Sequence, residues 1–416
     1  MNLTRRELML AAAAGPALLR PAAALAGEAA GPALPAKDDF APLAVTWLDA
    51  GSTHPMSLGA KAALDEYLRV RIQGGSQPGY SMSAKERTVV ERFGKLVGAD
   101  PEELCFVQST TMGENLVLQA LGIPASGGRI VTDALHFFGS HYTYGELARA
   151  GMDVVTLPMA ADGSIDIAGY EAAINRDTRL VAVSLVSTIN GYEHDLKRIC
   201  EIAHAAGVPV YADIVHAAGA VPTDLHASGV DFAAASSYKW LMGDFGLAFL
   251  YVRRGIQERL HRPWWGYHQL AEFRTHVYPY DEPGSAVASY RASDDASGLF
   301  AMGTTSWTGV VHLEYSLGWL LDTGLDAIQK WRQPMIEAIQ AELRRRGYEP
   351  LTPRSSRTPM VAFALKDARA RLSERLNDAK VRISVSQHRF RISIGVFNDM
   401  NDVDRLLEVL PKSPPG

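Results

Sequence analysis

The sequence predicts an α/β protein, with a mostly parallel, doubly wound sheet in a large domain and a smaller α+β domain at the C-terminal end. Short apolar runs rich in β-branched residues recur along the chain and alternate with longer stretches of helical period. Strands that alternate with helices in this way pack as a parallel sheet with helices on both faces. A length of 416 residues is enough for one large and one small domain.

The composition is that of a globular protein without nucleic-acid partners. Hydrophobic residues make up 47% of the chain and charged residues 21%, and the net charge is −5. A chain with no basic excess has little to neutralise the phosphates of DNA or RNA. The two cysteines, Cys105 and Cys200, do not make a disulfide framework or a metal cluster, so we expect no metal and place both thiols in the core.

The first 26 residues have the composition of an export signal. Thr4-Arg5-Arg6 precedes an alanine- and leucine-rich run that ends in the cleavage-like Ala24-Leu25-Ala26. The arginine pair resembles the twin-arginine (Tat) consensus, so we expect residues 1–26 to be a signal peptide read by the Tat export machinery and the mature protein to be periplasmic. No other stretch reaches the ~18 apolar residues of a spanning helix, so we expect no membrane span after processing. The alternative is a cytoplasmic protein whose start imitates a signal.

A linker and the first strands and helices follow. Residues 27–43 are rich in Gly, Ala and Pro without a period, which indicates a linker. The elements expected next are a strand near 44–48, helices over 57–73 and 83–97, and a strand at 105–107. A hydroxyl-rich string, Ser109 to Asn115, then stands at a strand-to-helix junction. Such a junction offers donors to a phosphate at a positive helix end, although taken alone it is more typical of an N-cap.

The later strands bring an acid and an amine to the same edge of the sheet. Strands are expected at 129–133, 154–157, 180–186, 208–212, 232–237 and 247–252, with a helix over 195–206. Asp213 directly follows one strand, and Lys239 follows the next. Active sites of open α/β sheets collect at the carboxyl ends of strands, so we expect these two side chains to be neighbours.

This pair suits pyridoxal 5'-phosphate. A lysine that forms an imine must lose its proton, which a partly desolvated pocket promotes. A carboxylate beside a pyridinium nitrogen keeps that ring protonated, so that the ring is an electron sink. A Schiff-base lysine and an acid for the ring nitrogen are what this cofactor requires of a protein. In isolation, an Asp and a Lys would more often cap a loop and lie on the surface.

A longer string surrounds the pair and consists of Asp213-x-x-His216, Gly229-Val230-Asp231, Ser236-Ser237-Tyr238-Lys239-Trp240, Gly243 and Gly246. It closely resembles the fold-type I, class V aminotransferase superfamily, which includes cysteine desulfurases, isopenicillin N epimerase-like proteins, kynureninases and C–S lyases. The resemblance implies that Lys239 is the Schiff-base lysine and Asp213 the partner of the ring nitrogen. It also implies His216 beside the phenolic oxygen of the cofactor, and Ser236 and Tyr238 as phosphate ligands.

Shorter strings extend the resemblance around the cofactor. The hydroxyl-rich string matches the phosphate loop of the family, which makes Thr110 and Thr111 phosphate candidates. Family members stack an aromatic residue or a histidine on the pyridine ring; Phe137 falls nearest that position, His136 is next to it, and the choice stays open. Thr188 replaces the asparagine that contacts the ring oxygen in desulfurases, which favours the epimerase-like branch.

The last part of the chain predicts a subunit contact and a carboxylate site. Residues 262–298 resemble an insertion that shapes a substrate entrance, and the following string is similar to the F-x-x-G-T of the family. Its Gly303-Thr304 pair would reach the cofactor phosphate of a neighbouring subunit, which implies a homodimer. The large domain is then expected over 44–310, and linking helices at 313–321 and 324–346 begin a small domain over 311–416. In the closing string, Arg391 would bind a substrate carboxylate as a bidentate fork.

The resemblance covers about Val45 to Leu410, but the superfamily supports many reactions. The stretch 381–389, just before the arginine, contains no cysteine, so a persulfide-forming desulfurase is disfavoured. We expect a periplasmic enzyme of aminotransferase, epimerase or lyase type that acts on an amino acid or an amino-bearing metabolite with a carboxylate. A periplasmic family member tailors siderophores, so tailoring of a siderophore or another secondary metabolite is a candidate. The alternatives are a C–S lyase, a cytoplasmic class V aminotransferase and, less favoured, a non-catalytic binding protein.

Overall fold

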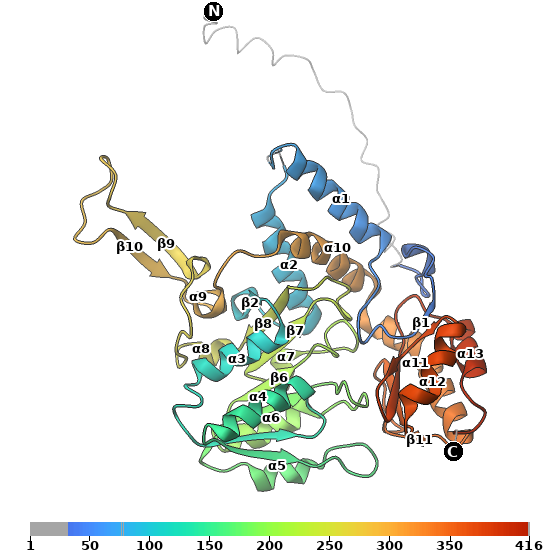
Figure 1. Ribbon diagram of the computed structural model, residues 1–416. Helices are drawn as coiled ribbons and strands as arrows, with labels where there is room; N and C mark the ends of the chain where they lie inside the picture. The colour runs from blue at the N-terminus through green and yellow to red at the C-terminus, as the bar shows by residue number, and fades with distance from the viewer. Residues whose placement is uncertain (1–31, 76, 78, 415–416) are drawn as a thin grey trace, which may run out of the picture. The chain divides into compact units, whose positions relative to one another are not determined.

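The computed structural model describes residues 32–75, 77 and 79–414. The predicted signal peptide, residues 1–26, lies outside them, and so do the first residues of the predicted linker. The described part contains a seven-stranded sheet, a four-stranded sheet and a projecting two-stranded hairpin (Figure 1). No helix among the described residues is long and apolar enough to cross a membrane.

The seven-stranded sheet is mostly parallel. Its strands are β2 (Leu104–Val107), β3 (Arg129–Asp133), β4 (Asp153–Leu157), β5 (Thr178–Ser184), β6 (Val210–Asp213), β7 (Phe232–Ser236) and β8 (Ala248–Val252). They lie in the order β2-β8-β7-β6-β5-β3-β4, and β8 alone among them runs antiparallel to its neighbours. The doubly wound sheet predicted from the sequence is confirmed.

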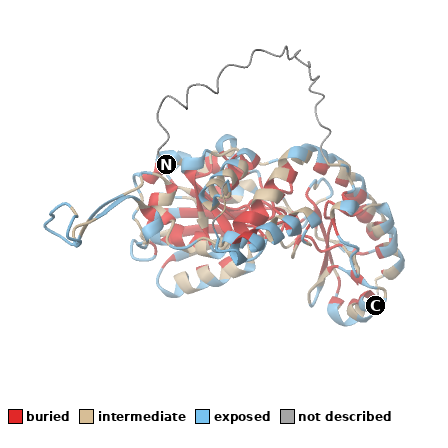
Figure 2. Cartoon of the chain, turned by 90° about the horizontal axis from the view of Figure 1, so that it is seen from above, coloured by how far each residue is buried: buried red, intermediate tan, exposed pale blue. Residues whose placement is uncertain are grey.

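The two faces of this sheet bury different clusters. Val181 and Val183 enter one cluster, whereas Leu180 and Ala182 enter the other, as the two-residue period of a strand requires. The first cluster contains side chains of α2 (Met82–Val97), α5 (Ile167–Ala173), α6 (Leu196–Ala205), α7 (Leu225–Ser228) and α10 (Trp307–Thr323). The second contains side chains of α3 (Thr110–Ala120), α4 (Phe138–Arg149), α8 (Arg254–Gln257) and α9 (Ala296–Phe300). Helix α1 (Leu58–Ile72) packs on α10. Figure 2 shows that burial is concentrated in the sheet between these layers.

A second, antiparallel sheet has its own core. Its strands, in the order β11-β12-β15-β14, are β11 (Glu349–Pro350), β12 (Met360–Ala364), β15 (Arg389–Ser393) and β14 (Ser384–Val385). The helices that pack with it are α11 (Leu325–Arg345), α12 (Ala368–Asp378) and α13 (Met400–Val409). The strand expected near 44–48 is only β1 (Thr46–Trp47), and it pairs in parallel with β13 (Val381–Arg382). Leu48 joins this second core, so the N-terminal arm packs against the C-terminal part of the chain.

Residues 262–298, which the sequence indicated as an insertion, contain a hairpin. Strand β9 (Leu270–Thr275) pairs with β10 (Ala288–Ala292), and the ribbon projects from the rest of the fold (Figures 1 and 2). Its large exposed side chains are Phe273, Val277, Tyr278, Tyr280, Val287 and Tyr290. A ribbon that buries neither face lacks the polar and apolar alternation by which a half-buried strand is recognised. Its place at a substrate entrance stays a prediction.

Candidate active site

The carboxyl ends of three neighbouring parallel strands carry polar side chains. Ser184, Asp213 and Ser236 are the last residues of β5, β6 and β7, and the strand register places Ser184 beside Asp213. Lys239 follows β7 by three residues and is buried, with 8% of its surface exposed. The acid and the amine therefore lie at neighbouring strand ends, as the sequence indicated.

Lys239, His216 and Trp240 form a buried chain of contacts. Nζ of Lys239 lies 3.0 Å from Nε2 of His216, and the indole N–H of Trp240 donates to Nδ1 of the same imidazole over 3.1 Å. An indole N–H only donates, so Nδ1 carries no proton and a neutral His216 holds its proton on Nε2. That proton is directed at Nζ, which must accept it. In this tautomer, the contact favours the neutral form of the Lys239 amine.

The electrostatics of the chain agree with this protonation. Burial lowers the pKa of Lys239 to about 8, with Asp213 opposing the fall and Arg391 adding to it. Burial, together with the charges of Lys239 and Arg391, also lowers the pKa of His216 well below its usual value, which keeps the imidazole neutral. The neutral amine is the form of lysine that attacks a carbonyl carbon.

Removing the indole donor should allow His216 to adopt its other tautomer. In Trp240→Phe the imidazole can place its proton on Nδ1 and accept at Nε2, so Lys239 can hold a proton. We expect the pH midpoint at which the cofactor-free protein forms an imine with added pyridoxal phosphate to move upward from about 8. Stopped-flow absorbance at a series of pH values measures it. Trp319→Phe is the matched control, because it removes an indole bond to Asp39 elsewhere. An unchanged midpoint in Trp240→Phe contradicts the tautomer assignment.

Asp213 is a buried carboxyl group with few partners. It accepts the backbone N–H of Val215 over 2.9 Å. Burial raises the pKa of Asp213, while the Val215 N–H and the charges of His136 and Lys239 limit the rise. A buried carboxylate gains by pairing with a cation. The protonated nitrogen of a pyridine ring is such a cation, so the position fits the predicted role.

The sequence analysis missed a buried network next to the end of β5. His136 contacts Oγ of Ser184 through Nδ1 (2.9 Å) and Oε1 of Glu114 through Nε2 (3.4 Å). Glu114 also accepts hydrogen bonds from Ser140 (2.7 Å) and Tyr144. Burial alone would lower the pKa of His136, but the hydrogen bond and the charge of Glu114 raise it. The network thus places a histidine that favours its charged form close to the pocket.

The two candidates for stacking on the cofactor ring differ in exposure. His136 is fully buried and both of its ring nitrogens are engaged. Phe137 is half-buried, and its ring centre lies 4.3 Å from that of Phe138. Phe137 is therefore the candidate with ring surface left for a ligand.

The phosphate candidates come together only in part. The backbone N–H of Thr110, the first residue of α3, donates to Oγ of Ser236 over 3.1 Å, and the two hydroxyls lie 3.4 Å apart. Backbone N–H groups and hydroxyls at the start of a helix form a site for an anion. Thr111 is exposed, and the ring of Tyr238 stacks on Phe245 with centres 4.4 Å apart. The pair Thr110 and Ser236 is thus the phosphate site that the structure assembles.

Arg391 crosses from the second sheet to this site. It donates to the carbonyl oxygen (2.9 Å) and the hydroxyl (2.7 Å) of Thr188 and to Oγ of Ser52 (3.0 Å). Its guanidinium is 3.6 Å from Asp49 and its side chain is 4% exposed. Thr188, which was predicted to contact the cofactor, therefore fixes the arginine in this structure. A buried guanidinium held in one orientation is suited to a carboxylate.

Thr304 and the two cysteines lie apart from this group. Thr304 is on an exposed segment after α9, where its hydroxyl is 2.8 Å from that of Tyr267. Cys105 and Cys200 are buried, as predicted, and burial raises the pKa of the Cys105 thiol far above its usual value and that of Cys200 to about 12. Neither thiol has the thiolate character of a nucleophile.

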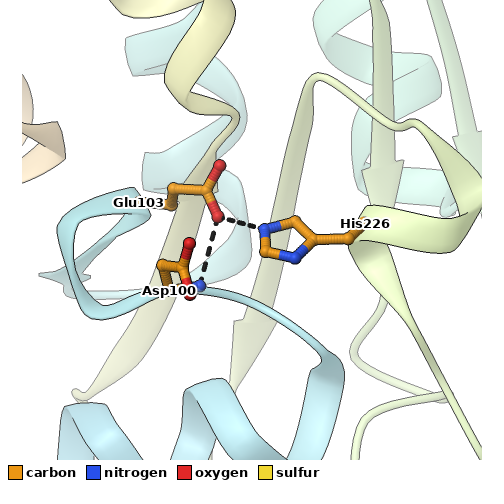
Figure 3. A group of neighbouring side chains, drawn as sticks. All are labelled: Asp100, Glu103 and His226. Carbon is orange, nitrogen blue, oxygen red and sulfur yellow. Dashed lines mark hydrogen bonds and ion pairs between the residues drawn. The ribbon is translucent and has the colours of Figure 1, made fainter.

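A separate group of possible metal ligands, Asp100, Glu103 and His226, lies within 4.8 Å of one another (Figure 3). Oε2 of Glu103 accepts from the Asp100 backbone N–H (3.1 Å) and contacts Nε2 of His226 (2.5 Å), and Oε1 accepts from the Arg254 N–H (2.8 Å). The hydrogen bond that His226 makes to Glu103 raises the pKa of His226, as expected for an ion pair. The group therefore acts as a capping box with a charged hydrogen bond, because both carboxylate oxygens already have partners.

Comparison with known proteins identifies the family. The model of the aminotransferase class-V family matches residues 48–406. The chain belongs to this family. Class V relatives include the cysteine desulfurase IscS of Shewanella baltica, 26% identical over 343 residues (80% of this chain, 83% of the relative). A cysteine desulfurase of Yersinia pestis is 27% identical over 343 residues (78% and 81%).

Solved structures of other proteins have the same fold. The cysteine desulfurase CsdA of Escherichia coli has a TM-score of 0.77 at 22% identity, over 90% of this chain and 97% of that one. The cystine C–S lyase C-DES has a TM-score of 0.74 at 17% identity, over 88% and 97%. These likenesses confirm the predicted fold-type I architecture.

As a class V member, the chain is a pyridoxal-phosphate-dependent enzyme. The residues present fit the cofactor: Lys239 offers a neutral amine, Asp213 a buried carboxyl group, and Thr110 with Ser236 a cluster of donors. When bound, the cofactor supplies an electron sink for a carbanion at the Cα of the substrate. Of the residues named from the sequence, Lys239, Asp213, Thr110 and Ser236 thus lie at or beside the ends of neighbouring strands, whereas Thr304 lies apart from them.

Proposed function

We propose that this enzyme acts on an amino acid, or an amino-bearing metabolite with a carboxylate, with Lys239 as the proton carrier. The reaction is of aminotransferase, epimerase or lyase type. One observation carries the proposal. A buried lysine amine, with its pKa lowered to about 8, lies near Arg391, a buried guanidinium that is able to receive a carboxylate.

Three residues have distinct roles in the proposed reaction: Arg391, Asp213 and Lys239. Arg391 binds the carboxylate of the substrate, and Ser52 and Thr188 hold the guanidinium in place through three hydrogen bonds. Asp213 holds the ring nitrogen in its protonated form. Lys239, with its pKa near 8, is able to take a proton from Cα and to return it at neutral pH. Burial of the lysine keeps competing water away from this proton.

C–S lysis is one form of this reaction that the comparisons support. The similar proteins include cysteine desulfurases and a cystine C–S lyase. Elimination of a sulfur group from Cβ also begins with removal of the Cα proton. Lys239 is able to act as the base in this step without the help of another residue. Epimerisation and aminotransfer instead return the proton to another face or another atom.

We propose that no cysteine of the protein takes part. Cys105 lies in β2 and Cys200 in α6, and both are buried with raised thiol pKa values. A Cys105→Ala, Cys200→Ala double variant should therefore keep turnover within about twofold of the parent, since thiols that are not ionised are not nucleophiles. Turnover of the variant is compared with its thermal stability and cofactor content. If a folded and loaded double variant is inactive, a persulfide-forming mechanism must be reconsidered.

The proposed function is tested by presenting candidate amines to the purified, cofactor-loaded protein. A substrate should change the visible absorbance of the cofactor on binding, because its amine replaces that of Lys239. Analysis for a 2-oxo acid, a released thiol or sulfide, or an inverted Cα distinguishes the three reaction types. A panel of carboxylate-bearing amines that leaves the spectrum unchanged would overturn the proposal.

We also propose that residues 1–26 direct Tat export to the periplasm. The support is the Arg5-Arg6 string and the cleavage-like Ala24-Leu25-Ala26 that follows. Replacing both arginines by lysine should retain the protein in the cytoplasm, as cell fractionation would report. Normal export of this variant would show that residues 1–26 are not a Tat signal. Tailoring of a siderophore or another secondary metabolite rests on export and family together and is proposed on that basis.

A homodimer is proposed on the position of Gly303 and Thr304. Both lie on an exposed segment beside a groove of about 1220 Å³, which is lined by parts of α2, β2 and residues 300–306. The exposure of this segment leaves it free to meet a second subunit, which is the contact that the resemblance implies. Light scattering that reports the mass of a monomer would contradict this arrangement.

A further inference from the structure

Two arginines lie side by side on one face of β15. Residues 389 and 391 are two apart in this strand, so their side chains leave the sheet on the same side, with Cα atoms about 6.6 Å apart. Both reach the loop after β5, where Arg391 donates to Thr188 and Arg389 to the carbonyl oxygen of Ile189 over 2.6 Å. The face of the second sheet that is turned to the active site thus carries two guanidinium groups.

These positive charges are not balanced by the acids around them. Asp49 is shared, at 3.6 Å from Arg391 and 3.5 Å from Arg382. No carboxylate among the described residues forms an ion pair with Arg389, and the cross-strand neighbours of Arg389 and Arg391 on β12 are alanines. Burial and the charge of Arg391 lower the pKa of Arg389 to about 10. Among the described residues, Asp49 is thus the one carboxylate that pairs with any of these three arginines, and it contacts only Arg382 and Arg391.

Arg389 also keeps donors that no hydrogen bond within the described part of the chain uses. A guanidinium has five N–H donors, and the carbonyl of Ile189 takes one of them. The side chain is half-buried, so part of its surface remains open. A partly desolvated cation beside a second cation is unfavourable unless an anion joins them. The observations indicate an anion that does not belong to the described residues.

We propose that Arg389 and Arg391 form a subsite for two carboxylates, so that the substrate is an amino dicarboxylate with a second acidic group a few carbons from its Cα. This inference rests on the proposed function for the role of Arg391 and adds the class of substrate. The spacing of the two arginines along β15 matches acids that stand several ångströms apart on one flexible chain. The competing explanation for the position of Arg389 is that it only stabilises the contact between the second sheet and the loop after β5.

Unreactive acids of equal length test the subsite in the cofactor-loaded protein. Glutarate and valerate have the same number of carbons but two carboxylates and one, respectively, and neither has an amine that could react. Calorimetric titration should give glutarate an affinity at least about tenfold higher than that of valerate, because it gains charge-assisted hydrogen bonds to Arg389. Equal affinity for the two acids, or no binding of either, overturns the inference.

Substitution of Arg389 tests whether this residue causes the preference for glutarate over valerate. Arg389→Gln should reduce the preference for glutarate to less than about threefold and leave the affinity for valerate unchanged, while Arg389→Lys should restore part of it. Arg375→Gln is the matched control, because Arg375 is an exposed arginine of the same domain that also donates to a backbone carbonyl. If Arg389→Gln weakens both acids equally and lowers the melting temperature, the arginine is a structural pin and the inference is wrong.

The outcome is separable from that of the proposed function. If the preference for glutarate depends on Arg389 but amino acids never change the cofactor spectrum, the subsite stands and the proposed reaction fails. If amino monocarboxylates and amino dicarboxylates change the spectrum with equal affinity, the proposed function stands and the dicarboxylate class is wrong.

Discussion

Lys239→Ala should lose the visible absorbance of the lysine–pyridoxal imine and at least about a thousandfold in turnover. The reason is that burial lowers the pKa of this amine to about 8, and its neutral form is the one that forms an imine. Absorbance spectra and turnover of the reconstituted variant measure both effects. Lys239→Arg should fail equally, since a guanidinium keeps its proton and cannot form an imine.

A lysine outside the site is the control for this experiment. Lys197 lies on the exposed side of α6, and Lys197→Ala should keep the imine band and the turnover of the parent. A Lys239→Ala protein that retained the band after purification and fresh addition of cofactor would show that another amine holds the cofactor.

Arg391→Ala should weaken productive binding of a carboxylate-bearing amine by at least about tenfold, because each charge-assisted hydrogen bond that is lost is worth about 1.5–3 kcal/mol. Spectral titration of the loaded protein gives the dissociation constant. Arg391→Lys should recover only part of the loss, since an ammonium is not a planar fork. It also keeps a positive charge near the buried Asp49, which controls for misfolding.

An amine without a carboxylate separates recognition from general damage. Its affinity should be the same in the parent and in both Arg391 variants, because it offers nothing for the guanidinium to bind. If the variants lose affinity for this amine as well, Arg391 supports the shape of the pocket and its role as the carboxylate ligand is wrong.

The sequence predicted the structure correctly where an apolar run has the length and boundaries of a strand, and where functional residues follow the ends of such runs. Strand β3 has the predicted bounds, Arg129–Asp133, because a short apolar run is bounded there by turn residues. The meeting of Asp213, His216 and Lys239 could be predicted because parallel strands end at one edge of the sheet. Both the bounds of β3 and the meeting of these strand-end residues follow from the order of residues within short segments of the chain.

Contacts between distant segments could not be predicted in the same way. The hydrogen bond between Glu114 and His136 joins two segments 22 residues apart, and no period in the sequence marks it. The short strand β1 pairs with β13 more than 300 positions later, and two residues carry no pattern. The environment of Arg389 was equally hard to predict, since its lack of an acidic partner among residues 32–75, 77 and 79–414 depends on which side chains the fold brings near it.

The central claim is that Lys239 alone holds the cofactor, and chemical reduction tests it most directly. Borohydride treatment of the wild-type holoenzyme fixes the imine as a stable amine, and peptide mass spectrometry then locates the phosphopyridoxyl group. We expect one modified peptide, with the group on Lys239. Modification of a different lysine, or of none in protein that shows the imine band, would contradict the assignment of the active site.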